Sequence, residues 1–200
     1  MEILVSICVG VGLSAACGFR VFVPLLVMSM ASLGGHLTLS PGFEWIGSYP
    51  ALVAFAIATC LEVAGYYVPW VDNLLDTITT PAAIIAGIIV MASAVSGMSP
   101  FLKWALAVIA GGGIAGTVQV VTGMTRGAST VTTAGVGNPL VATMEFGGAI
   151  ALSALAVVLP VLAGIVVFGL LCFGGKKLYE KRRGGSPHAR ATEKSPASAK

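Results

Sequence analysis

Long apolar blocks dominate this sequence and constrain its fold more than any other feature. They cover residues 3–33, 50–69, 81–124 and 139–173, with polar or turn-rich stretches between them. Of the 200 residues, 56% are hydrophobic and only 10% are charged, whereas soluble domains contain about 25% charged residues. A soluble core cannot absorb this much apolar surface. The sequence therefore predicts an all-α, polytopic membrane protein.

The block lengths predict about five membrane spans, since one upright span needs about 20 residues. Residues 50–69, 81–98 and 101–122 each fit a single span, but 3–33 and 139–173 are too long. These two overlong segments must tilt, protrude or break. Each contains one ionisable residue and a proline in its interior: Arg20 and Pro24 in the first, Glu145 and Pro160 in the second. This combination favours broken or re-entrant helices that line a polar cavity.

Four prolines predict where helices begin, because proline is favoured at the first helical position and a preceding polar residue can cap the helix. The pairs are Tyr49-Pro50, Thr80-Pro81, Ser99-Pro100 and Asn138-Pro139.

Basic residues concentrate at the C-terminal end. Eight of the eleven lie between Lys176 and Lys200, which leaves no basic face for a nucleic acid. We expect residues 1–175 to form a helical transmembrane domain and 176–200 a disordered tail. The positive-inside rule places this tail in the cytoplasm. There the tail can contact anionic lipid at about 1 kcal/mol per basic residue.

Three charged residues lie inside apolar sequence: Arg20, Glu62 and Glu145. A charge in hydrocarbon costs at least about 2.5–3.5 kcal/mol, so each needs a partner or water. One interpretation is a polar cavity for a substrate or ion, and the other is an Arg–Glu pair that only fixes helix packing. Tyr66 stands one turn after Glu62, where its phenol can hydrogen-bond the carboxyl group.

Asp72 and Asp76 stand four residues apart, so on a helix they share a face and repel each other. A bound cation, an ion pair with Arg126 or plain solvent offsets that repulsion. The sequence thus offers a cation or ion-pair site here, with a solvated acidic turn as the alternative.

The stretch 122–137 is rich in hydroxyl side chains and contains four glycines and Arg126, just before Asn138-Pro139. Hydroxyl donors, Arg126 and the start of the next helix can together bind an anion. The stretch matches no phosphate-binding fingerprint, so an ordinary Gly/Thr loop is the alternative.

No catalytic set or metal motif is visible in the sequence. His36 and His188 lie outside the apolar blocks, and the four cysteines show no CxxC or ligand spacing. We therefore assign no catalytic residue, metal or cofactor from the sequence.

Four motifs resemble a bacterial integral membrane family catalogued as domain of unknown function 4126. They are GLSAACGFRVFVP at 12–24, DNLLDTITTP at 72–81, TRGAST at 125–130 and GNPLVA at 137–142. The resemblance covers about residues 3–173 and implies an integral membrane protein, which we expect in a bacterial inner membrane. It implies no activity, because that family has none to carry over.

Two modules of weak similarity are also visible, one from Gly12 through Arg20 to Pro81 and one from Gly112 through Arg126 to Pro139. Inverted repeats with broken helices are common in secondary transporters. The leading hypothesis is therefore a small transporter or permease for a small, anionic solute. In this hypothesis the protein forms a homodimer to complete the transport path. The competing hypothesis is a scaffold or assembly factor that transports nothing.

Overall fold

The computed structural model describes the backbone of residues 2–67 and 69–184. It also describes their side chains, except at 69–77, 175 and 177–184. All regular structure in this part of the chain is helical. The elements, in chain order, are α1 (Glu2–Cys17), α2 (Phe22–Leu33), the 3₁₀ turn η1 (Glu44–Gly47), α3 (Tyr49–Gly65), α4 (Pro69–Ala94), α5 (Pro100–Leu106), the π-helical η2 (Ala107–Gly112), α6 (Gly113–Thr133), α7 (Asn138–Val158) and α8 (Pro160–Gly184).

The chain forms two compact units, Met1–Gly164 and Ile165–Lys200. The first unit holds every helix from α1 to α7 and the first turn of α8. The second contains the rest of α8.

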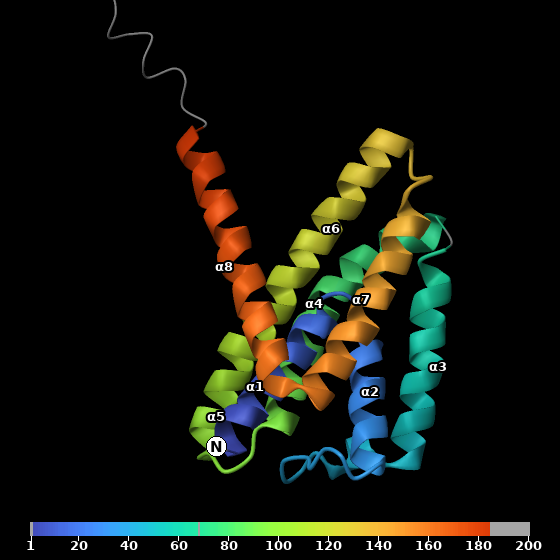
Figure 1. Ribbon diagram of the computed structural model, residues 1–200. Helices are drawn as coiled ribbons and strands as arrows, with labels where there is room; N and C mark the ends of the chain where they lie inside the picture. Colours follow the sequence, from blue (N-terminus) through green and yellow to red (C-terminus); the bar gives the residue numbers. More distant parts are fainter. Residues whose placement is uncertain (1, 68, 185–200) are drawn as a thin grey trace, which may run out of the picture. The chain divides into compact units, whose positions relative to one another are not determined.

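The overlong segment 3–33 is a hairpin of two short helices. Helix α1 ends at Cys17 and α2 begins at Phe22, with Pro24 in its first turn, where the missing N–H costs least. The start of α1 and the residues that follow α2 line one hollow, which contains Glu2 and His36, so the two helices run antiparallel. At 1.5 Å per residue, α1 is about 24 Å long and α2 about 18 Å. Figure 1 shows the two helices of this hairpin. Arg20 lies in the connection between them, residues 18–21, which forms the tip of the hairpin.

The second overlong segment is also broken. Helix α7 ends at Val158, Leu159 has φ −132° and ψ 68°, and α8 begins at Pro160. Proline has no N–H to continue the helical ladder, which is why the chain breaks at this point. Both overlong segments are thus broken into two helices and do not form one long helix that tilts or protrudes.

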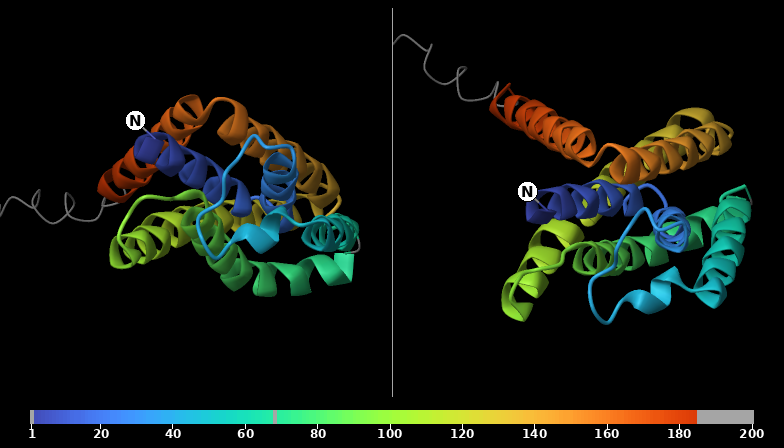
Figure 2. Two further views of the ribbon diagram at one scale, coloured as in Figure 1. Left: turned by 90° about the horizontal axis from the view of Figure 1, so that it is seen from below. Right: turned by 60° about the horizontal axis from the view of Figure 1, so that its bottom comes forward.

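Helix α1 lies between α4 and α7, as both views of Figure 2 show. Small residues allow this close packing. A Cβ on Gly12 of α1 would lie 2.7 Å from Cβ of Ala156 in α7. On the other side, Ser14 donates to the Gly87 carbonyl of α4 at 3.0 Å.

Three of the four predicted helix starts are confirmed. Ser48 Oγ caps α3 by accepting from Ala51 N, Ser99 Oγ caps α5, and α7 begins at Asn138. The fourth is wrong, because Pro81 lies inside the 26-residue α4, which begins at Pro69. A helix tolerates an internal proline where tertiary packing on both sides outweighs the lost hydrogen bond.

The expected loop at 122–137 is helical as far as Thr133. Threonine hydroxyls in α6 donate back to the carbonyl four residues earlier, as Thr130 does to Arg126 at 3.0 Å and Thr133 to Ser129 at 2.7 Å. This satisfies the hydroxyl groups inside the helix. Only four residues, 134–137, connect α6 to α7, and Ala134 takes the left-handed conformation with φ 51°.

Two helical segments are long and apolar enough to cross a bilayer: Pro100–Thr133, with 34 residues, and Asn138–Val158, with 21. The other apolar segments with described side chains, such as Ile78–Ala94 of α4 and Pro160–Gly174 of α8, are shorter. Five spans and the internal repeat stay predictions.

Candidate functional site

Five predicted site residues converge at the tip of the α1–α2 hairpin, and we call them the polar cluster: Arg20, Glu62, Tyr66, Arg126 and Glu145. They come from the hairpin tip, the end of α3, α6 and α7. All five are buried, with exposed fractions between 1% and 6%. Residues up to 125 positions apart in the sequence thus share one small volume.

Arg126 and Glu145 form a two-point ion pair. Arg126 Nε donates to Glu145 Oε1 at 3.0 Å, and Arg126 Nη2 lies 2.7 Å from Glu145 Oε2. A guanidinium that engages both carboxylate oxygens is fixed in orientation as well as compensated in charge. This pair joins α6 to α7 across the short connection between them.

Arg20 is held more loosely. Its Nη2 donates to the Ala142 carbonyl of α7 at 2.8 Å and lies 3.6 Å from Glu145 Oε2. Its Nε and Nη1 are buried and have no hydrogen-bond partner within the described part of the chain. Glu145 therefore serves both arginines, but it engages Arg126 much more closely.

Tyr66 orders both arginines through its ring. The guanidinium carbon lies 3.9 Å from the ring centroid for Arg20 and 4.2 Å for Arg126. Desolvated cation–π contacts of this kind contribute about 2 kcal/mol each. The Tyr66 hydroxyl donates to Thr79 Oγ1 at 3.3 Å, and that oxygen also accepts from Gln119 Nε2 at 3.0 Å.

Glu62 caps the second helix of the hairpin. Its two carboxylate oxygens accept from the backbone N–H groups of Val21 at 2.8 Å and Phe22 at 3.1 Å. A carboxylate at a helix N-terminus satisfies unpaired N–H groups and the positive end of the helix dipole. The expected hydrogen bond between Tyr66 and Glu62 is wrong, because both groups bond elsewhere.

This cap predicts the effect of Glu62→Gln. The amide places a donor against one of the two N–H groups, so we expect a loss of about 1–3 kcal/mol in the free energy of unfolding. Denaturant unfolding of the purified protein in detergent measures it. The control is Glu44→Gln, since Glu44 Oε2 makes the same type of contact with Gly42 N at 2.8 Å on the exposed surface. Equal stability of the two variants would contradict the cap.

The remaining predicted site residues are placed differently. Asn138 Nδ2 donates to Thr130 Oγ1 at 2.9 Å at the exposed end of α6 and α7, two turns from Glu145. The backbones of Asp72 and Asp76 lie in α4, but their side chains fall outside the described residues. The proposed cation or ion-pair site there stays a prediction.

Sequence reasoning missed two side chains that support the cluster, Thr79 and Gln119. Both are buried, with exposed fractions of 6% and 3%. The available signal was Gln119, an amide within the apolar stretch 101–122, which needs a polar partner when buried.

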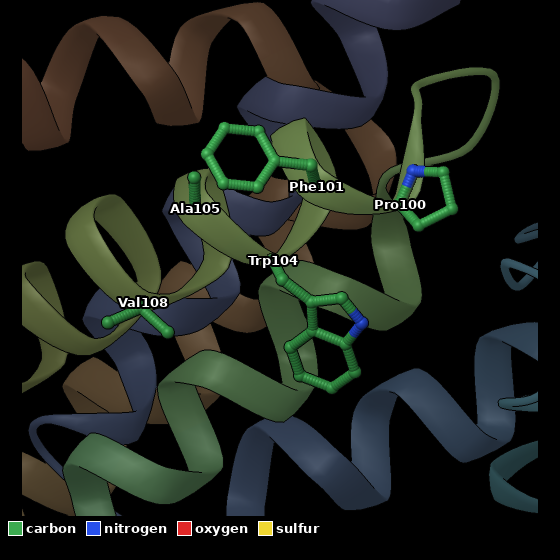
Figure 3. A pocket seen from close by; sticks show the side chains of 5 residues that line it. All are labelled: Pro100, Phe101, Trp104, Ala105 and Val108. Carbon is green, nitrogen blue, oxygen red and sulfur yellow. The ribbon is translucent and has the colours of Figure 1, made fainter.

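Two hollows lie away from the cluster. One, of about 420 Å³, is lined by Glu2, Ser6, His36 and other residues where α1 begins and α7 ends. The other, of about 460 Å³, lies along α5 and the start of η2, and Figure 3 shows its lining: Pro100, Phe101, Trp104, Ala105 and Val108. That lining is apolar, so this hollow offers nothing to a polar solute.

The fold and the polar cluster define an all-helical protein that contains helices of membrane-spanning length and a buried arginine–glutamate centre. The comparison with known families makes the assignment specific. This chain belongs to the family described as Domain of unknown function (DUF4126), which matches residues 7–178. The resemblance seen in the four sequence motifs is thereby confirmed. No curated protein and no solved structure matched the chain.

Proposed function

We propose that this protein is a small integral membrane transporter whose solute passes through the polar cluster. The observation that carries the proposal is the convergence of two arginines and two glutamates at a helix break inside an apolar fold. Charged residues within membrane segments mark substrate or ion pathways far more often than other positions do. Two buried guanidinium groups favour a small, anionic solute.

The surface of the first unit supports the membrane part of the proposal. Large apolar side chains are highly exposed on the long segments, among them Phe101 at 80%, Ile109 at 77% and Met144 at 71%. Soluble monomers rarely leave large apolar patches in water, and so many exposed apolar side chains favour a lipid environment. The apolar hollow in Figure 3 fits lipid acyl chains in the same way.

The hairpin supports the transport part. Neither α1 nor α2 reaches the roughly 30 Å of a hydrocarbon core on its own. If α1 starts at one membrane face, its end places Arg20 within the bilayer. Unpaired backbone is tolerated at that depth only where it is buried in protein or lines a cavity, and transporters place such breaks at their binding sites.

The basic tail gives the orientation that we propose. Lys176 and Lys177 follow the apolar part of α8, and the positive-inside rule favours the cytoplasmic side of a bacterial inner membrane for such a basic end. Contact of residues 176–200 with anionic lipid and dimerisation remain parts of the same proposal.

One observation favours a scaffold instead. All five residues of the polar cluster are at most 6% exposed, and the Arg126–Glu145 pair is compensated within the protein. A buried ion pair can fix how helices pack without touching any solute. Transport therefore requires that the cluster open.

A flux assay separates the two functions. Protein that stays in the membrane after carbonate extraction is purified and reconstituted in liposomes. Uptake of acetate, phosphate, chloride and neutral glycerol is then measured. We expect saturable uptake of a small anion, reduced about tenfold or more by Arg20→Gln, since one charged hydrogen bond contributes about that factor. Lys103→Gln is the control, because Lys103 donates to Ser40 Oγ at 3.1 Å, away from the cluster. The proposal is refuted if no solute is taken up by liposomes in which the orientation of the protein has been verified. It is also refuted if carbonate extraction releases the protein into the aqueous wash.

A further inference from the structure

The two arginines of the polar cluster differ in what they still have to offer a ligand. Arg126 is engaged at Nε and Nη2 by both oxygens of Glu145. Arg20 uses only Nη2, for the Ala142 carbonyl and the longer contact to Glu145. Its Nε and Nη1 are buried, and neither has a hydrogen-bond partner among the residues that the structure describes.

Unpartnered donors on a buried cation are costly. Arg20 is 1% exposed, so surrounding solvent does not replace the missing partners. A buried donor without an acceptor carries its full desolvation penalty, and the penalty is larger for a charged group. Two other members of the polar cluster do have partners: Glu62 accepts from backbone N–H groups with both oxygens, and the Tyr66 hydroxyl donates to Thr79 Oγ1.

We propose that Arg20 is the ligand-binding residue of the cluster and takes the oxyanion group of a small solute, a carboxylate or a phosphate, at Nε or Nη1. A guanidinium has donors and no acceptor, so its partner must be an acceptor, and an anionic oxygen compensates the charge as well. Directed N–H groups on a planar fork favour oxyanions over a halide. The substrate class rests on the proposed function, whereas the binding site does not.

The surroundings hold Arg20 ready for this role. Tyr66 stacks against its guanidinium at 3.9 Å, and the Ala142 carbonyl holds Nη2 at 2.8 Å. Because the Arg20 side chain is already ordered before a ligand binds, binding does not cost this conformational entropy, and the affinity is higher. Arg126 is closely paired with Glu145, so we expect the anion to bind at Arg20 and not at Arg126. Glu62 fills the N-terminus of α2, which would otherwise compete for the same anion.

Thermal unfolding of the purified full chain in detergent tests the site without any transport. Sodium acetate and sodium phosphate are titrated at constant ionic strength, with sodium chloride as the balancing salt. A ligand that binds the folded state raises the melting temperature in a saturable way. We expect this from acetate, from phosphate or from both, and the comparison identifies the preferred oxyanion.

The variants assign the effect to Arg20. Arg20→Gln should weaken the apparent affinity about tenfold or more, and Lys103→Gln, which removes a positive charge elsewhere, should leave it unchanged. If Arg20→Gln does not fold, Arg20→Lys keeps the charge and should still weaken binding, because it lacks the fork. No saturable shift in the unmodified protein, or equal affinity in the folded Arg20 variant, overturns the proposal.

The outcomes separate this inference from transport. Anion binding without flux in liposomes refutes the transporter and keeps the anion site. Flux of a neutral solute that is insensitive to both oxyanions and to Arg20 refutes the anion site and keeps the transporter.

Discussion

Glu145→Gln should destabilise this protein more than any other single polar substitution, by about 3–5 kcal/mol in the free energy of unfolding, because it leaves buried cations without their carboxylate. Glu145 lies 2.7 Å from Arg126 Nη2 and 3.6 Å from Arg20 Nη2. Both arginines are 1% exposed, so water does not replace the lost charge. Urea or thermal unfolding in detergent measures the loss.

A double substitution shows whether the loss comes from unpaired charge. Arg126→Gln together with Glu145→Gln removes the close pair as a unit, and we expect it to be more stable than Glu145→Gln alone. Neighbouring residues in one network show coupling of about 0.5–3 kcal/mol in such cycles. Additive effects of the two changes, or a Glu145→Gln variant as stable as the unmodified protein, would show that the pair is not a buried ionic centre.

Gly111→Ala is an apolar change with a large expected effect. A Cβ at Gly111 would lie 2.5 Å from the Gly87 carbonyl oxygen and 2.7 Å from Cβ of Met91, both in α4. The oxygen belongs to the backbone, so α4 and η2 must separate to admit a methyl group. Overpacking of this kind costs about 1–3 kcal/mol.

Gly113→Ala is the matched control for this contact, two residues further along. A Cβ there meets nothing within 4 Å. Alanine is preferred over glycine in a helix by about 0.5–1 kcal/mol, so this variant should be slightly more stable than the unmodified protein. A melting temperature for Gly111→Ala at or above that of Gly113→Ala would refute the close approach of α4 and η2.

The polar cluster shows how far residue-by-residue reasoning reaches. Arg20, Glu62 and Glu145 were identifiable because a charge in apolar sequence must find a partner. Which charge pairs with which was not identifiable, because the pairing depends on where α3, α6 and α7 pass the hairpin tip. Hence Tyr66 was assigned to Glu62 by its one-turn spacing, whereas its ring serves the arginines and its hydroxyl serves Thr79.

Helix boundaries divide in the same way. Ser48 and Ser99 mark helix starts locally, since a cap and the proline after it act within one turn. Pro81 carries a similar local signal but lies within α4, and the Gly/Thr stretch before Ala134 is helical. In both places packing and back-bonded hydroxyl groups outweigh the local preference for a break.

The sequence by itself determined the all-helical class, the family and the need for a partner at each charge within an apolar block. These follow from composition, motifs and the cost of an unpaired charge, which are the same wherever the helices lie. Only the tertiary structure decided that 3–33 folds back as a hairpin, that Glu145 serves two arginines and that two donors of Arg20 have no partner among the described residues. Those features arise from contacts between residues far apart in the chain, and no local spacing encodes them.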